Sequence, residues 1–341
     1  MSSFFLGIIT GGLATLVLLI VGALSLIRFS DIYGLGHWVL NVEAPLPSMW
    51  MNLGFWTDRE GKPVRQFREA TRALLEKMLE SASLLIDCDP SKASADLCEA
   101  VAVLDVGIGC GDQTVALAEL VHAQKRPAFR YVGLTLNSTQ LQTAQARLET
   151  KFKSNQLSRN DFQVFQADAA KPSSWSASVQ ASVDSLADKV FSQRWLIGLD
   201  CLYHFSPSRR LIFRQAAQGL DANVLAFDLV LGDGATFLES IAVRLLAFFL
   251  SCPFNTFLTE EHYKDQLAEC GFDRASITIE DVSDHVFAGL ATFINTQDTA
   301  LKPYGISMTG YRLVGKVFAW FDRSRVVKAS IIVGRVKSKA Q

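Results

Sequence analysis

A short glycine-rich run is the part of the sequence best suited to bind a ligand. Gly107, Gly109 and Gly111 follow an apolar stretch that contains Asp105. Because glycine has no Cβ, it lets a backbone approach a bound molecule closely. The spacing is G-x-G-x-G, and Asp112 stands where a dinucleotide-binding turn has its third glycine. A carboxylate there repels a pyrophosphate, so the run disfavours a dinucleotide, whereas a ligand without phosphate is acceptable and a cationic one can suit the acidic turn. A tight structural turn is the other interpretation.

The segments around this run alternate between apolar stretches and helical patterns, as βαβ units do. Buried parallel strands read as continuous apolar runs, and we expect them at 101–106, 131–136, 162–166, 195–199 and 224–229, with late strands at 276–282 and 326–336. Helices are expected at 64–85, 114–121, 139–153 and 209–219. The fold class is therefore α/β, a doubly wound and mostly parallel, Rossmann-like sheet with its ligand at the C-terminal strand ends. Residues 237–257 and 289–321 are expected to cap that end.

Several segments in the same order resemble the class I methyltransferases, in which D-V-G-x-G-x-G marks the cofactor turn. They are N-L-G-F-W at 52–56, G-L-T-L-N-S-T-Q at 133–140, A-D-A at 167–169 and L-D-C-L-Y-H-F at 199–205. The group they resemble includes microbial sugar O-methyltransferases, tocopherol methyltransferases and cyclopropane fatty acid synthases. Two departures stand out: Thr135 and Leu136 replace the usual acidic residue after the second strand, and residues 220–223 replace the usual Pro-Gly-Gly turn.

The resemblance implies S-adenosyl-L-methionine as the cofactor. It implies that this cofactor is held by Asp105, Gly107, Gly109, Gly111, Thr135, Leu136, Gln140, Asp168, Ala169 and Asp200. Asp105 would orient the glycine loop or receive the cofactor's amino group. Asp168 would accept the adenine amino hydrogen, with Ala169 packed against the ring. For both aspartates, capping of a helix, loop or turn is the structural alternative.

His204 is the polar residue that the resemblance places nearest to the reaction. Methyl transfer displaces a sulfonium in line, and a hydroxyl nucleophile must lose its proton. An imidazole with a pKa near ~6.5 suits that task. In the sugar O-methyltransferases a histidine at this position acts as a base and pairs with an aspartate ending the fifth strand, a position that Asp228 matches. A histidine that merely packs the loop is the alternative.

The N-terminus carries an uncharged apolar stretch from Phe4 to Ile27. About 20 such residues in a helix cross a bilayer core of ~30 Å. A cleaved signal peptide is less favoured, because the start has no basic residue and the apolar run is too long. The basic residues Arg28 and Arg59–Arg72 favour a cytosolic C-terminal side. We expect a single-pass anchor, on the endoplasmic reticulum with the catalytic domain facing the cytosol.

Composition narrows the class of partner. Lys+Arg number 33 against 34 Asp+Glu, so nothing indicates the basic surface of a nucleic-acid-binding protein. The 23 Phe and a mean hydropathy of +0.20 favour a lipophilic substrate. The apolar segment 241–250 could line a pocket for it or lie on a membrane surface. No two of the six cysteines have C-x2-C spacing, so no metal site is expected.

Taken together, these observations predict three regions: an anchor at 1–29, an aromatic linker and helical cap at 30–98, and a methyltransferase domain at 99–341 with cap insertions at about 235–260 and 286–322. The leading hypothesis is O-methylation of a hydrophobic small molecule, such as a terpenoid, polyketide or lipid of secondary metabolism, with His204 as general base. C- or N-methylation is the alternative. A membrane scaffold with a degenerate methyltransferase fold and a dehydrogenase are two further hypotheses.

Overall fold

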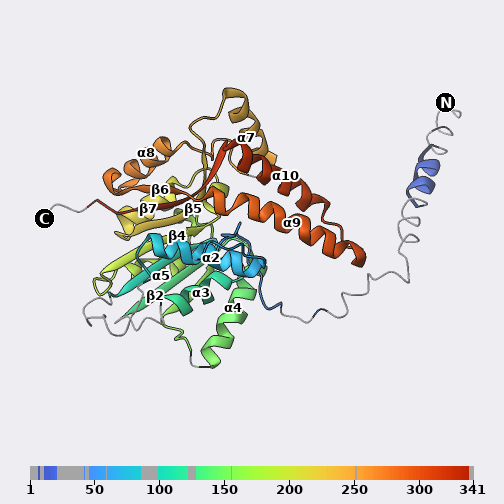
Figure 1. The fold of residues 1–341 in the computed structure, drawn as a ribbon. Coiled ribbons are helices and arrows are strands. Elements are labelled where there is room, and N and C mark those ends of the chain that lie inside the picture. Colours follow the sequence, from blue (N-terminus) through green and yellow to red (C-terminus); the bar gives the residue numbers. More distant parts are fainter. Residues whose placement is uncertain are drawn as a thin grey trace. The chain divides into compact units, whose positions relative to one another are not determined.

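The computed structural model (Figure 1) describes Gly7, residues 11–20, Val42, and residues 46–58, 60–85, 99–121, 128–154, 156–249 and 252–337. The chain divides into two units. One comprises Met1–Leu46 with Thr296–Thr309, and the other comprises Pro47–Asn295 with Gly310–Gln341. The second unit holds the sheet and most of the residues of the helices that cover it.

A seven-stranded sheet with the order β3-β2-β1-β4-β5-β7-β6 forms the centre of this unit. Its parallel strands are β1 (Val101–Val106), β2 (Phe129–Thr135), β3 (Phe162–Gln166), β4 (Gln193–Leu199) and β5 (Asn223–Leu231). The late strands β6 (Thr278–Asp281) and β7 (Val327–Gly334) join antiparallel beside β5. The strand order reverses between β1 and β4, which is the point where doubly wound sheets bind their ligands.

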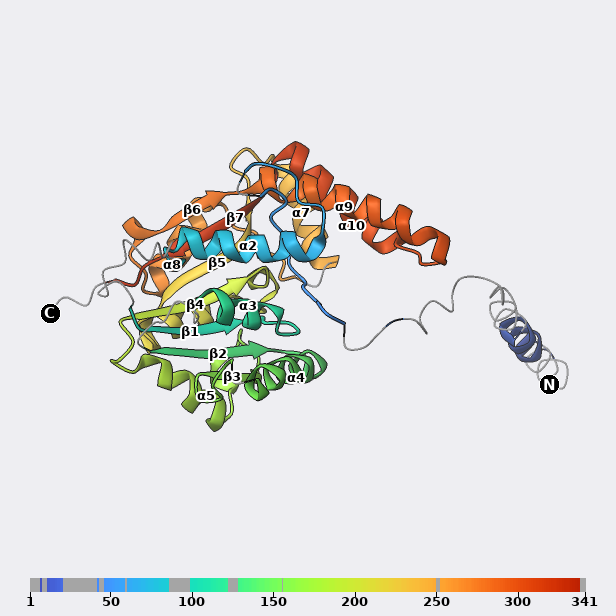
Figure 2. The ribbon, with the colours of Figure 1, turned by 60° about the horizontal axis from the view of Figure 1, so that its bottom comes forward.

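Helices cover both faces of the sheet, which explains why the parallel strands are apolar throughout (Figures 1 and 2). All six residues of β1 are buried. One face packs α2, α3 and the C-terminal helices α9 and α10 in a cluster that includes Leu75, Leu117 and Phe287. The other face packs α5, α6 and α8 in a cluster that includes Val183, Phe213 and Tyr263. The bounds of the helices are α2 Phe67–Ser81, α3 Asp112–Leu120, α4 Ser138–Lys153, α5 Ala177–Asp184, α6 Arg210–Arg214, α7 Phe237–Phe249, α8 Glu260–Cys270, α9 Phe287–Leu301 and α10 Thr309–Ser324.

The predicted α/β architecture with a mostly parallel sheet is confirmed, and two helices were missed. The sequence prediction has no helix at α5 or at α8. Helix α8 is mostly polar and buries only a narrow stripe that includes Tyr263 and Leu267. The segment 286–322, predicted as a cap, contains the helices α9 and α10, and the segment 235–260, also predicted as a cap, contains α7.

The N-terminal anchor predicted at 1–29 lies largely outside the described residues. Within it the structure describes Gly7 and residues 11–20, which are helical. In the described parts of the chain, no helix is long and apolar enough to span a membrane. Most of the linker expected at 30–98 before residue 46, and residues 86–98, also lie outside the described residues.

Candidate functional site

The glycine run forms a tight turn between β1 and α3, as the sequence predicts. Gly107, Gly109 and Gly111 all have positive φ, at 76°, 54° and 85°. A Cβ at Gly107 would lie 2.7 Å from Cys201 Cβ, and one at Gly111 would lie 2.8 Å from the Cα of Ala144 in α4. The first glycine therefore admits the end of β4, and the last lets α4 pack against the start of α3.

Asp105 stabilises this turn through hydrogen bonds of its buried side chain. Its carboxylate accepts hydrogen bonds from Gln113 Nε2 at 2.6 Å and from the Tyr131 hydroxyl at 2.7 Å. Tyr131 in turn contacts the Thr114 hydroxyl at 2.8 Å. Complete burial raises the pKa of Asp105 to about 8. Asp105 is absent from the lining of the adjacent cavity, so of the two roles expected for it the structure supports orientation of the loop.

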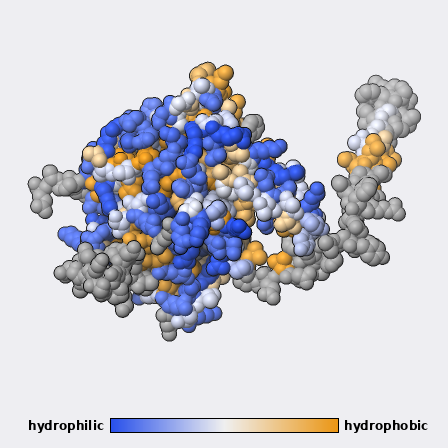
Figure 3. All heavy atoms as spheres, viewed as in Figure 1, coloured by the Kyte–Doolittle hydropathy of each residue, from blue (hydrophilic) through white to orange (hydrophobic). Residues whose placement is uncertain are grey.

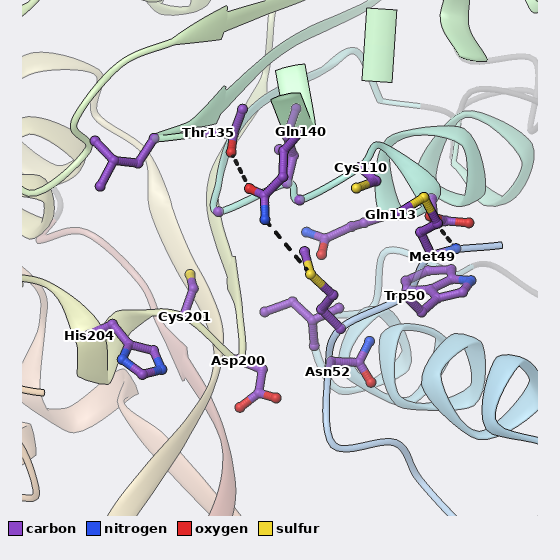
Figure 4. Close-up of a pocket in the computed structure, with 17 residues that line it drawn as sticks. Met49, Trp50, Asn52, Cys110, Gln113, Thr135, Gln140, Asp200, Cys201 and His204 are labelled. Carbon is purple, nitrogen blue, oxygen red and sulfur yellow. Dashed lines mark hydrogen bonds between the residues drawn. The ribbon is translucent and has the colours of Figure 1, made fainter. Parts of the chain in front are cut away.

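A cavity of about 360 Å³ opens in front of the turn (Figure 4). Its walls come from the glycine turn, the end of β2, the end of β4 and the segment before α2. It is lined by Met49, Trp50, Met51, Asn52, Gly107, Ile108, Gly109, Cys110, Asp112, Gln113, Thr135, Leu136, Gln140, Leu199, Asp200, Cys201 and His204. The volume falls within the ~300–1,000 Å³ typical of small-molecule sites.

The end of β2 presents a polar pair in place of the usual acidic residue. Thr135 donates to Gln140 Oε1 at 2.7 Å, and Gln140 Nε2 lies 3.7 Å from Met51 Sδ. Leu136 is 68% exposed beside them. Thr135, Leu136 and Gln140, which the resemblance implies as cofactor contacts, all line the cavity, and the first and last bring a hydroxyl and an amide group to it.

Asp168 and Ala169 lie outside the cavity lining, although the sequence predicts them as adenine contacts. The Asp168 carboxylate accepts from the Ala170 N–H at 2.9 Å and pairs with Lys171 at 3.2 Å. This is the turn-capping arrangement that the sequence left open as the alternative. Ala169 is buried, in the apolar cluster on the α5 side of the sheet.

Residues 47–56, hereafter the N-terminal strap, form a wall that sequence reasoning did not assign to the site. Asp112 Oδ2 accepts from the Met49 N–H at 3.1 Å, and Asp112 Oδ1 pairs with Arg147 at 2.8 Å. At the other end, Asp200 Oδ2 accepts from the Leu53 N–H at 2.8 Å. The two carboxylates therefore attach the strap to α3 and to β4. The sequence signal was the N-L-G-F-W element at 52–56, which indicated a resemblance but no contact.

Asp200 directly follows β4 and has a left-handed backbone conformation with φ 58°. Besides Leu53, it binds the Tyr203 hydroxyl at 2.8 Å. Burial raises the pKa of Asp200 to about 7. Asp200 also lines the cavity, and its carboxylate joins the strap to the loop that follows β4.

His204 lies at the cavity wall, but Asp228 is not its partner. Asp228 is fully buried and is held by Arg209, by the Tyr263 hydroxyl at 2.8 Å and by the Leu229 N–H at 2.9 Å. The expected His204–Asp228 pair is therefore corrected: alternate residues of β5 face opposite sides of the sheet, and Asp228 faces the α6 and α8 side.

The ring of His204 instead contacts a sulfur. Its Nδ1 lies 3.2 Å from Cys252 Sγ, in the loop after α7. Partial burial lowers the pKa of His204 below its ordinary value, and the charge of Asp228 acts in the opposite direction. The lowered pKa favours the uncharged ring, which is the form that can accept a proton.

Of the twelve residues that the sequence predicts for the site, seven line one cavity. They are Gly107, Gly109, Thr135, Leu136, Gln140, Asp200 and His204. Asp105 and Gly111 support the turn. Asp168, Ala169 and Asp228 lie outside the lining, each held by the surrounding protein.

Comparison with solved structures identifies the fold. The chain is similar to a putative sarcosine dimethylglycine methyltransferase from Galdieria sulphuraria, at 12% identity and TM-score 0.58, covering 84% of this chain and 93% of that one. It is similar to the cyclopropane synthase MmaA2 from Mycobacterium tuberculosis, at 15% identity and TM-score 0.54, covering 84% and 90%. It is also similar to a geranyl diphosphate methyltransferase in complex with SAM, at 13% identity and TM-score 0.50, covering 84% and 98%.

No protein-family model and no curated protein sequence matches the chain. At 12–15% identity the structural similarity establishes the fold, whereas the chemistry has to be argued from the site. The strand order, the glycine turn after β1 and these similarities agree: the chain has the fold of the class I S-adenosylmethionine-dependent methyltransferases.

Proposed function

We propose that the chain is an S-adenosylmethionine-dependent methyltransferase that acts on a hydrophobic small molecule. The observation that carries this proposal is that one cavity has the glycine turn on one wall and His204 on another. A cofactor on the turn and an acceptor near the histidine would then share one enclosed space. Holding two reactants together in this way is the main task of an enzyme for a displacement reaction.

The residues present fit S-adenosylmethionine better than a phosphate-bearing nucleotide. A phosphate binds the free N–H groups at a helix N-terminus. Here the first residue of α3 is Asp112, whose carboxylate already accepts from Met49 and pairs with Arg147. A sulfonium ligand bears positive charge and tolerates this acidic edge. Gly107 and Gly109 leave backbone open to it, while Thr135 and Gln140 offer hydrogen bonds to its ribose.

When bound, the cofactor supplies an electrophilic methyl group. The chain's own residues have to orient the acceptor and exclude water. For a hydroxyl acceptor they also have to take a proton. His204 is suited to the last task because its pKa is lowered and the neutral ring is present at pH 7. Methylation of oxygen with His204 as base is therefore the leading chemistry.

The apolar character of the surroundings favours a lipophilic acceptor. Trp50, Met51 and Leu199 contribute apolar wall to the cavity. Helix α7, which leads into the loop that contacts His204, exposes Phe237 at 78% and Phe248 at 67%. Figure 3 shows hydrophobic surface at the top of the view, where α7 lies in Figure 1.

Residence at a membrane is part of the same proposal. The uncharged stretch Phe4–Ile27 is long enough to anchor the chain. An exposed apolar face on α7 suits a domain that works beside a bilayer. We propose the endoplasmic reticulum membrane with the domain in the cytosol, since the basic residues follow the stretch.

Binding of the product form of the cofactor tests the proposal first. Calorimetric titration of the full-length chain in detergent with S-adenosylhomocysteine should give micromolar affinity that is lost in Gly107→Arg. Gly234→Arg is the matched control, because a Cβ at Gly234 meets nothing within 4 Å. If the folded wild-type chain does not bind, the methyltransferase proposal fails and a scaffold with this fold takes its place. A parallel titration with NAD tests the dehydrogenase alternative.

Methylation of carbon or nitrogen is the second candidate. The observation that favours it is the absence of the expected contact between Asp228 and His204, because a base without a carboxylate partner is weaker. Incubation with labelled S-adenosylmethionine and a panel of lipophilic phenols, alcohols and amines separates the two. O-methylation predicts a rate that rises with pH through a pKa below 6.5 and falls at least tenfold in His204→Ala. An unchanged rate in that variant would favour the second candidate.

A further inference from the structure

The loop after α7 places a sulfur atom against the ring of His204. Cys252 Sγ lies 3.2 Å from His204 Nδ1, within hydrogen-bonding distance for sulfur. Cys252 is buried and does not line the cavity, whereas His204 does. Nδ1 therefore has the sulfur as its hydrogen-bond partner, and Nε2 is the ring nitrogen available to a molecule in the cavity.

Several contacts hold this loop against the segment that carries His204. The Cys252 N–H donates to the Ala247 carbonyl of α7 at 2.8 Å. The Thr256 hydroxyl donates to the Tyr203 carbonyl at 2.6 Å, one residue before the histidine. Arg209, which is held by Asp228, donates to the Thr256 carbonyl. These hydrogen bonds hold the loop, and with it the sulfur, against the segment that carries His204.

Building on the proposed function, we infer that Cys252 is the positioning residue of His204: its sulfur binds Nδ1, sets the ring plane and turns Nε2 toward the acceptor. It takes the place that a carboxylate holds in a histidine–aspartate pair. A thiol can donate to a ring nitrogen or accept from it. For Nε2 to take a proton from the acceptor, Nδ1 must carry the ring hydrogen and donate it to the sulfur.

The groups around the ring agree with a neutral partner. Burial raises the pKa of Cys252 to about 11, so the thiol is uncharged at pH 7. Asp228 acts on the ring from β5 through space, and Tyr203 packs beside it at 4.4 Å between ring centroids. Asp200 is bound by the Tyr203 hydroxyl. No carboxylate in the described residues hydrogen-bonds the ring, which suits a histidine whose pKa stays below the ordinary value.

Titration of the His204 ring by NMR tests the inference directly in the full-length chain, without any substrate. The signal is assigned as the one missing in His204→Gln. In Cys252→Asp, a carboxylate at Nδ1 should raise the ring pKa by about one unit or more. In Cys252→Ala, the Nδ1 resonance should move because its partner is lost, and Cys252→Ser should restore most of that shift. Cys270→Ala is the matched control, since Cys270 is buried and contacts the Arg210 carbonyl instead.

The outcome is separable from the test of cofactor binding. If Cys252→Ala remains folded and leaves the Nδ1 resonance and the pKa of His204 unchanged, the inference is overturned. The same holds if Cys270→Ala moves them as far. Because Cys252 does not line the cavity, its variants should bind S-adenosylhomocysteine as the wild type does. If the wild-type chain does not bind S-adenosylhomocysteine, the proposed function is refuted, and the NMR titration still decides whether Cys252 positions His204.

Discussion

The substitution Gly107→Ala tests how far the glycine turn depends on its close packing against Cys201. The φ of 76° at this residue makes any side chain strained, by about 1–2 kcal/mol. Gly61 has φ 79° and open space around its Cβ position, so Gly61→Ala introduces the same backbone strain without a steric clash. The two substitutions therefore differ in what the new methyl group meets and not in the backbone conformation that it must adopt.

The magnitude follows from the neighbour at Gly107. A Cβ there would lie 2.7 Å from Cys201 Cβ, about 0.8 Å nearer than the ~3.5 Å contact distance of two carbons. Overpacking of this kind costs about 1–3 kcal/mol beyond the strain. We expect Gly107→Ala to lower the free energy of unfolding by about 2–5 kcal/mol and Gly61→Ala by about 1–2 kcal/mol.

Urea unfolding and calorimetric titration with S-adenosylhomocysteine provide the assay. Relief of the clash has to move either the turn or the end of β4, and both line the cavity. The affinity of Gly107→Ala should therefore fall at least tenfold, while Gly61→Ala keeps the wild-type value. Equal stability and equal affinity in the two variants would refute the argument that close approach to Cys201 is what requires glycine.

Two further predictions concern buried carboxylates. Asp228→Asn and Arg209→Met should each lower the free energy of unfolding by about 3–5 kcal/mol, because each leaves one member of a buried ion pair without its partner. In a double-mutant cycle measured by urea unfolding, the combined variant should lose less free energy than the sum of the two single losses, and strict additivity would contradict the pairing. The pKa of Asp105 is about 8 in the folded chain against an ordinary value of 3.8. Between about pH 4 and pH 8 the folded chain therefore keeps a proton on Asp105 that the unfolded chain has lost, so the free energy of unfolding falls as the pH rises through this range. Asp105→Asn should therefore flatten the decline in unfolding free energy between pH 6 and pH 8 by up to ~1.4 kcal/mol per pH unit, and an unchanged slope would show that Asp105 is already ionised there.

The elements predicted best from the sequence are those whose local pattern and tertiary environment coincide. The strand expected at 101–106 matches β1 because a parallel strand buried on both faces must be apolar throughout. Helix α5 escaped prediction because it is only eight residues long, and α8 because its polar residues outnumber those it buries. In both, packing against the sheet supplies stability that the local sequence does not signal.

The candidate site shows the same division. The glycine turn is local, so its position followed from seven consecutive residues. The partner of His204 is not local: it depends on which side of the sheet Asp228 faces and on Cys252, 48 residues further along the chain. The strap was missed because its attachment relies on main-chain N–H groups of Met49 and Leu53, which carry no side-chain signature.

The attachment of the strap links occupancy of the cavity to the motion of the backbone. A ligand that touches Met51 and Asn52 stabilises the closed strap, and by reciprocity a closed strap tightens the ligand. The amide hydrogens of Met49 and Leu53 are bonded to Asp112 and Asp200 only while the strap is seated. Their exchange with deuterium therefore reports directly how often the cavity opens. Both hydrogen bonds must break before the strap can leave the cavity, so exchange at these two amides should slow when S-adenosylhomocysteine is bound.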